Sequence, residues 1–189
     1  IYGSLNSIES STASNSASGM ANSVLGFGNR TQNANASLVW GTGNEVTNSI
    51  EDVNFSTNWN KTSASDAQKE IIKVMQSDQY AGGSVMAIGG GNKADWATYS
   101  QLLGVQNTLT GTEKDVSKLT LINGYKNAVT NAQNTTIIGS NNTATNIQST
   151  IVMGDHNTLE GRKNVISLGN NNTVVVDDAV AIGNSTKVT

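Results

Sequence analysis

Short apolar runs recur along the chain, and a glycine closes each of them. From Gly124 onward these glycines are spaced by 15, 15, 15 and 14 residues. A fixed period of this length is typical of repeat architectures, in which each repeat is one supersecondary unit. Two longer steps, from 41 to 89 and from 104 to 124, predict insertions. The closing glycines are Gly28, Gly41, Gly89, Gly104, Gly124, Gly139, Gly154, Gly169 and Gly183.

A column of asparagines follows the glycines at a distance of three residues. Thr31 and Thr186 take this place in two copies. Apolar residues stand one and three residues before the glycine and five residues after it. The repeat unit is therefore close to apolar-x-apolar-Gly-x-x-Asn-x-apolar. The asparagines are Asn44, Asn92, Asn107, Asn127, Asn142, Asn157 and Asn172.

This unit predicts one coil of an all-β solenoid. Alternating apolar residues before the glycine predict a short strand with one face inward. Glycine accepts a positive φ and asparagine closes a turn, so the chain reverses there. A single coil cannot bury its own face, so coils of 14–15 residues are expected to stack on each other. The asparagines are then expected to form an amide ladder from coil to coil.

The residue two positions before each glycine is also mostly apolar or small, as at Val39, Leu102 and Ile137. We assign this column to the outer face of the strand, and the columns one and three before the glycine to the interior. A strand that is apolar on both faces is buried on both. The outer face is therefore predicted to pack against another copy of the same chain.

Two insertions interrupt one predicted domain, 1–189, whose coils occupy 1–46 and 84–189. Within the first insertion, about 47–83, residues 63–83 predict a helix with Ser65 as N-cap, Gln68 completing the capping box, and Gly82 and Gly83 at its end. The helix is expected to pack on the stack and cover Trp40, or to present the loop before it. The second insertion, about 110–118, predicts a short turn. The apolar stripe of the helix comprises Ala67, Ile71, Val74 and Met75.

Composition narrows the classes of function. The chain has a net charge of −3 and no cysteine, so we expect neither a nucleic-acid partner nor disulfides or thiolate metal sites. No apolar run approaches the roughly 20 residues of a membrane-spanning helix. The chain begins and ends inside repeating material, so we expect it to be part of a longer protein.

His156, the only histidine, follows Asp155 and is the first candidate for chemistry. Both residues occupy variable turn positions of the repeat, where other copies carry Arg30, Gln106 or Asn171. We therefore interpret His156 as a surface turn residue. The sequence predicts no catalytic residues, no metal site and no cofactor, and hence no enzyme.

Three segments resemble a known family. SVMAIGGGN (84–92), DAVAIGNST (178–186) and ISLGNNN (166–172) are similar to the SVAIG-type repeats in the heads of YadA-like trimeric autotransporter adhesins. The resemblance implies a left-handed parallel β-roll, with three chains around one axis, in a bacterial outer-membrane protein on the cell surface. It also implies non-catalytic attachment to host matrix, host cells or other bacteria. An anchor outside the chain described by this sequence would join the head to the membrane.

The insertions supply the non-repetitive surface, so the ligand candidates are sought there. Phe55 and Trp59, in the loop 51–62, are the first choice as aromatic anchors, and Trp96 and Tyr99 are the second. The alternative is that these aromatics pack under the helix.

Two other solenoid classes compete with the adhesin. Hexapeptide-repeat acyltransferases are also left-handed and trimeric, but each of their coils is built from three hexapeptide edges and is longer than the period found here. An ice-binding solenoid needs a flat Thr-x-Thr array, and the sequence shows a single partial column of Thr108, Thr143, Thr158 and Thr173.

Overall fold

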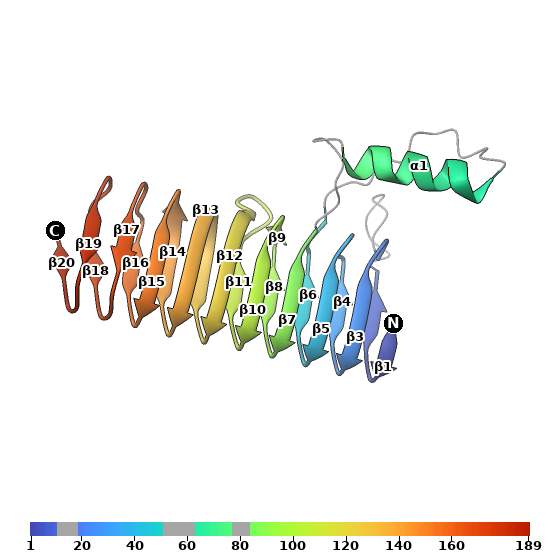
Figure 1. The fold of residues 1–189 in the computed structure, drawn as a ribbon, viewed down its shortest axis with the longest axis horizontal. Helices are drawn as coiled ribbons and strands as arrows, with labels where there is room; N and C mark the ends of the chain where they lie inside the picture. The colour runs from blue at the N-terminus through green and yellow to red at the C-terminus, as the bar shows by residue number, and fades with distance from the viewer. Residues whose placement is uncertain (11–18, 51–62, 77–83) are drawn as a thin grey trace.

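The computed structural model describes residues 1–10, 19–50, 63–76 and 84–189. In this part of the chain nearly all regular structure is parallel β, and the strands join into one 20-stranded sheet that winds along the molecule. Figure 1 shows the strands stacked in chain order from the N-terminus to the C-terminus. This architecture is consistent with the solenoid that the period predicts.

Each coil has a first side, formed by the strand that carries the closing glycine. These strands pair in parallel along the whole stack. They are β1 (Tyr2–Ser4), β3 (Ser23–Phe27), β5 (Leu38–Thr42), β7 (Met86–Gly90), β10 (Gln101–Val105), β12 (Ser117–Tyr125), the end of β13 (Ala128–Ser140), β15 (Ile151–Asp155), β17 (Ile166–Leu168) and β19 (Val180–Ile182).

The second side is formed by the short strand that follows the asparagine. The start of β13 belongs to it, because Ala128–Thr130 pair with β11. A narrow third side returns the chain to the next coil and includes β9 (Ala97–Thr98). The second-side strands are β2 (Ser7–Glu9), β4 (Arg30–Gln32), β6 (Glu45–Thr47), β8 (Lys93–Asp95), β11 (Thr108–Thr110), β14 (Thr143–Gln148), β16 (Thr158–Glu160), β18 (Thr173–Val174) and β20 (Lys187–Val188).

The register corrects one closing glycine. Gly26, and not Gly28, pairs with Gly3 and Gly41, so the step to Gly41 equals the regular step of the later coils. Gly28 lies in the following turn at φ +63°. The column needs glycine because neighbouring coils approach closely: a Cβ at Gly139 (φ +135°) would overlap the carbonyl oxygen of Gly154.

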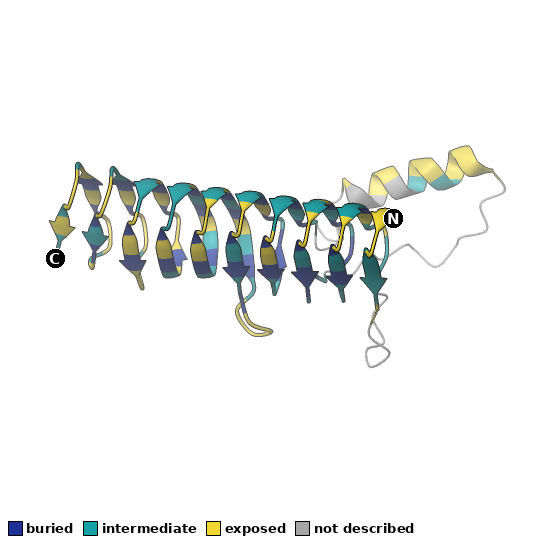
Figure 2. Ribbon diagram, turned by 90° about the horizontal axis from the view of Figure 1, so that it is seen from below, coloured by how far each residue is buried: buried dark blue, intermediate teal, exposed yellow. Residues whose placement is uncertain are grey.

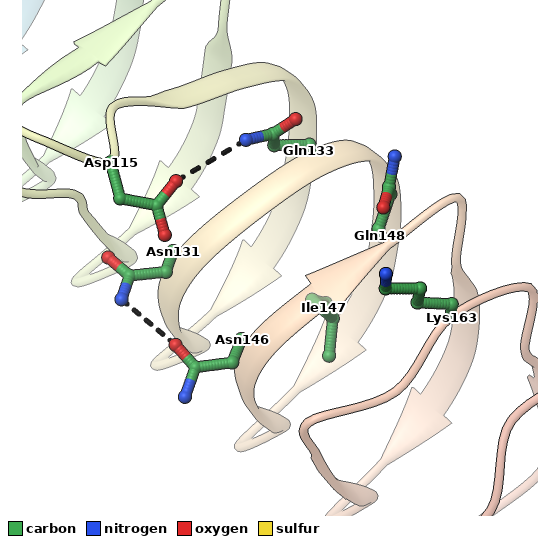
Figure 3. Close-up of a pocket in the computed structure, with 7 residues that line it drawn as sticks. All are labelled: Asp115, Asn131, Gln133, Asn146, Ile147, Gln148 and Lys163. Atoms are coloured by element: carbon green, nitrogen blue, oxygen red, sulfur yellow. Dashed lines mark hydrogen bonds between the residues drawn. The ribbon is translucent and has the colours of Figure 1, made fainter.

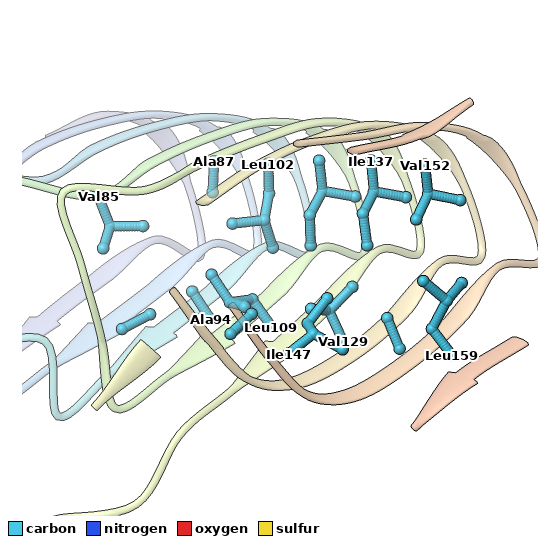
Figure 4. Packing of buried hydrophobic residues seen from close by; sticks show 14 of the residues in the cluster. Val85, Ala87, Ala94, Leu102, Leu109, Val129, Ile137, Ile147, Val152 and Leu159 are labelled. Atoms are coloured by element: carbon cyan, nitrogen blue, oxygen red, sulfur yellow. The ribbon is translucent and has the colours of Figure 1, made fainter. Parts of the chain in front are cut away.

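The structure also reverses the two faces of the first-side strands. The column two residues before the glycine, predicted to lie outside, is the core: Val39, Leu102 and Ile137 are each fully buried. The columns one and three before the glycine point outward. Figure 4 shows core side chains of the first side facing those of the second side, such as Leu109 and Leu159. The prediction was wrong because apolar residues stand on both faces of these strands. Little alternation of apolar and polar residues is left to show which face points inward.

Helix α1 (Ala64–Met75) lies in the first insertion and is shorter than the predicted 63–83. Its N-cap is Ser63 and not Ser65, because the backbone N–H of Asp66 donates to Ser63 Oγ at 3.2 Å and Ser63 Oγ donates to Asp66 Oδ2 at 2.8 Å. The expected end at Gly82 and Gly83 lies outside the described residues. Among those residues, no helix has the length and apolarity to cross a membrane.

The helix does not cover Trp40, which is 58% exposed. Figures 1 and 2 show α1 beside the N-terminal coils, with much of its surface exposed. The second insertion forms a short loop between β11 and β12, as expected for a turn. Its ends are joined by a bond from Thr112 N to the carbonyl oxygen of Asp115 (2.9 Å) and by the reciprocal bond (3.1 Å).

Candidate functional site

Asparagine side chains form a ladder at the turn between the first and second sides. Asn142 Nδ2 donates to Asn127 Oδ1 (2.9 Å) and to the carbonyl oxygen of Gly154 (2.7 Å). Asn142 Oδ1 accepts from the backbone N and from Nδ2 of Asn157, both at 2.9 Å. These amides bond to one another and to backbone, so the ladder is scaffold and offers nothing to a ligand. It runs through Asn6, Asn29, Asn44, Asn92, Asn107, Asn127, Asn142, Asn157 and Asn172.

The outward face of the first side is a candidate interaction surface. It follows the strands along the stack, and its apolar side chains are partly or largely exposed; Trp40 is 58% and Ile182 is 68% exposed. Polar residues interrupt it at Ser23, Gln101, Asn123 and Thr136, and none of its residues is charged. Exposed apolar surface without charge is typical of interaction sites. Its apolar members are Leu25, Leu38, Trp40, Met86, Ile88, Leu103, Leu121, Ile138, Ile151, Met153, Ile166, Leu168, Val180 and Ile182.

The outward face of the second side differs, because charges of alternating sign line its N-terminal part. Arg30 bonds to Glu9 and to Glu45, each at 3.0 Å, and Lys93 lies 3.8 Å from Glu45. The hydrogen bond from Arg30, and then that from Ser7, hold the pKa of Glu9 below its ordinary value. The hydrogen bond to Glu9, and then that to Glu45, raise the pKa of Arg30. Such exposed pairs are weak individually and leave this side solvated.

Threonines occupy the next part of the second side. The register adds a second column, with Thr110 next to Thr130 and Thr130 next to Thr145, to the partial column expected from Thr108 and Thr143. The array is still broken: Ala128 stands between Thr108 and Thr143, and Glu160 follows Thr145. An ice-binding face would need regular Thr-x-Thr rows, so this interpretation gains little from the structure.

His156 lies in the turn after β15, exposed and at φ +58°. Asp155 is engaged in the coil stack, because its Oδ1 accepts from Ser140 N at 2.8 Å. The neighbouring pair is therefore not a shared site. Across the residues that the structure describes, no group of three or more His, Asp or Glu side chains could hold a metal ion.

The four aromatic ligand candidates are not brought together in the described residues. Phe55 and Trp59 lie outside them. Trp96 and Tyr99 flank β9 on the third side, both half-buried and at positive φ (+49° and +51°). Tyr99 lines one cavity of 310 Å³ with Leu38 and Met86, and a second of 200 Å³ with Leu119.

A further cavity lies on the third side, between the 111–116 loop and the coils of β13 and β14. Figure 3 shows polar side chains around it. These residues belong to no sequence motif, and Asn131 and Asn146 resemble ordinary turn residues. Both asparagines lie seven residues after a closing glycine, and both have a positive φ, +49° and +54°. This shared position in the repeat could have indicated that they lie next to each other.

Comparison with known proteins gives no match. No protein family, no curated protein and no solved structure matches the chain.

Proposed function

We propose that the chain is the head of a trimeric, non-catalytic bacterial surface adhesin of the YadA-like type. The observation that carries the proposal is the uncharged apolar face of the first side, which runs along the stack and which a monomer would leave in water. Three copies that pack these faces around one axis would bury it. The left-handed wind of the coils and the outer-membrane location belong to the same proposal.

The length of the coils favours this interpretation over the hexapeptide-repeat acyltransferase. Register partners on the first side recur at one constant step for several coils, as from Gly124 to Gly139 and from Gly139 to Gly154. This step is too short for a coil of three hexapeptides. The three short sides seen here also have different lengths, so they do not divide into equal hexapeptides.

The adhesive partner would be host matrix, a host cell surface or another bacterium. A rod with identical coils presents the same surfaces repeatedly, and threefold display raises the effective concentration of each weak site. The second side and the insertions stay exposed in such an assembly, and they are where we place contact with the partner.

A binding screen tests the proposal. The intact protein is tested against matrix proteins, host cells and bacteria, beside a variant made monomeric by Met153→Asp and a variant whose residues 50–82 are replaced by an ordinary coil connection. We expect the intact protein to bind, the monomeric variant to lose avidity, and the replacement variant to lose partner preference. Absence of binding to all three classes of surface would contradict the proposed function.

A further inference from the structure

The cavity on the third side combines side chains from three coils and one loop. It has a volume of 160 Å³. Ile147, which is 2% exposed, contributes its apolar floor. The polar residues around it are Asp115, Asn131, Gln133, Asn146, Gln148 and Lys163.

Two hydrogen bonds fix part of this wall. Gln133 Nε2 donates to Asp115 Oδ1 at 3.4 Å, and Asn131 Nδ2 donates to Asn146 Oδ1 at 2.9 Å. Figure 3 shows both bonds along the rim. The first, a long bond, joins the loop that carries Asp115 to the coil of β13, and the second joins the coils of β13 and β14.

Two acceptors in the cavity have no donor from the described part of the protein: one is buried, and the other belongs to the exposed Asp115 and faces solvent. Asn131 Oδ1 is buried without a hydrogen-bond partner, and Figure 3 shows it on the side of Asp115. The Gln133 bond engages only Oδ1 of the Asp115 carboxylate. A buried acceptor without a partner is unfavourable, so a donor from a ligand or from water would stabilise this end of the cavity.

Donors that bond to none of the described protein groups lie beside Asn131, at Asn146, and at the opposite end, at Gln148 and Lys163. The corner amides stop at Asn146, because the next coil carries Gly161 at that place, and Nδ2 of Asn146 donates no bond within the described residues. Gln148 and Lys163 are exposed, and in the same part of the chain their side chains make no hydrogen bond or ion pair with protein groups. A cavity lined by both acceptors and donors suits groups that both donate and accept.

We propose that this cavity is a subsite for one sugar ring, with Asp115 and Asn131 accepting from neighbouring hydroxyls and Gln148 and Lys163 donating to ring substituents. Hydroxyls carry one donor and two acceptor lone pairs, which matches this mixed wall. The sugar would be the ligand in the adhesive function proposed above. The biological purpose of the subsite rests on that function, whereas sugar binding itself does not.

Size and charge separate a sugar from the other ligand classes. Drug-sized ligands occupy roughly 300–1,000 Å³, so 160 Å³ suits a single ring rather than an oligosaccharide. A calcium ion needs about 6–8 oxygen ligands, and the cavity has one carboxylate. The charges of Asp115 and Lys163 offset each other, so the cavity has no net charge that would favour a simple anion. One open subsite binds weakly, and three copies in a trimer would gain through avidity.

The test is NMR titration of the wild-type protein with the methyl glycosides of glucose, galactose, mannose and N-acetylglucosamine at millimolar concentrations. We expect at least one of them to shift the side-chain amide signals of Asn131, Asn146 and Gln148 in a saturable way. Asp115→Asn is expected to weaken that binding at least about tenfold, because a hydrogen bond to a charged group is lost. Glu113→Gln makes the same charge change in the same loop away from the cavity, and is expected to leave binding unchanged.

Three results would overturn the sugar subsite: no saturable shift with any of the four glycosides, equal weakening by Asp115→Asn and Glu113→Gln, or equal shifts with glycylglycine, which would indicate a site for zwitterions. Gln148→Ala serves as a second variant if Asp115→Asn does not fold. The NMR shifts report sugar binding whether or not the protein forms a trimer. A trimer that adheres to surfaces but binds none of the glycosides would contradict the subsite and leave the adhesin proposal intact.

Discussion

The first and second sides of the solenoid share one core, but they differ in what they show to the outside. The first side presents apolar residues such as Met153 and Ile166 along the stack, and no charge. The second side presents the ion pairs of Arg30 and the threonines around Thr143. Burial of the core explains neither pattern, because both sides use their inward residues equally. This contrast is the reason for our proposal that the first side is covered in an assembly, whereas the second side faces solvent.

The largest expected effect is on the first-side backbone. Gly139→Ala would force a Cβ into the carbonyl oxygen of Gly154 at φ +135°. Because the backbone cannot move aside as a flexible side chain does, we expect the free energy of unfolding to fall by about 3 kcal/mol or more for each chain. Thermal unfolding followed by circular dichroism measures it.

Gly43→Ala is the matched control for this effect. Gly43 also has a positive φ, +64°, but a Cβ there meets nothing within 4 Å. Its expected penalty is about 1 kcal/mol, from the left-handed backbone alone. Equal destabilisation by the two substitutions would show that close approach between coils is not what selects glycine.

The next effect distinguishes the two outward faces. Met153→Asp places a charge on the apolar first side, where burial in an interface would be unfavourable, and is expected to prevent assembly. Thr143→Asp places the same charge on the second side and is expected to leave assembly unchanged. Sedimentation velocity of both variants measures this, and dissociation by Thr143→Asp alone would reverse the assignment of the faces.

A smaller effect is expected at the turn that joins the sides. Asn142→Ala removes an amide that takes part in bonds to Asn127, Gly154 and Asn157. Buried groups are left unpaired, so we expect a loss of about 2–3 kcal/mol per copy in denaturant unfolding. Thr158→Ala, at an exposed position of the second side, is the control; a loss as large as that of Asn142→Ala would show that the ladder has no special role.

The smallest effect concerns the ion pairs of the second side. The pKa of Glu9 is depressed in the folded state, so its contribution is present above its ordinary pKa of 4.5 and is lost as the pH falls through the folded value. Arg30→Gln is expected to lower the melting temperature slightly at neutral pH, and the difference is expected to vanish in high salt and in acid. A difference that persists in both conditions would point to packing rather than charge.

The repeat could be predicted from the sequence because glycine and asparagine recur at fixed spacing, and both types are required by backbone geometry. The phase of the apolar columns could not, since apolar residues on both faces remove the alternation. The polar residues among the apolar ones indicated which columns face outward. Gln101, Asn123 and Thr136 interrupt the outward columns, whereas only Ser167 interrupts the core column. The shift from Gly28 to Gly26 had a similar clue in Asn29, which continues the ladder.

The site was less predictable than the fold. The cavity gathers Asp115 from an insertion and Lys163 from a coil much later in the chain, and neither belongs to a motif. Trp96 and Tyr99 were candidate ligand contacts because they are aromatic. Both lie at corners of the coil with positive φ, and the sequence pattern alone does not predict where those corners fall.

The mass of the wild-type chain in solution tests the central claim most directly. The claim is that the uncharged first side is buried between three copies. Light scattering at micromolar concentration is predicted to give three times the 19.7 kDa of one chain, unchanged on dilution through the micromolar range. A folded particle of 19.7 kDa that stays soluble would contradict it, because the apolar face of the first side would then be stable in water.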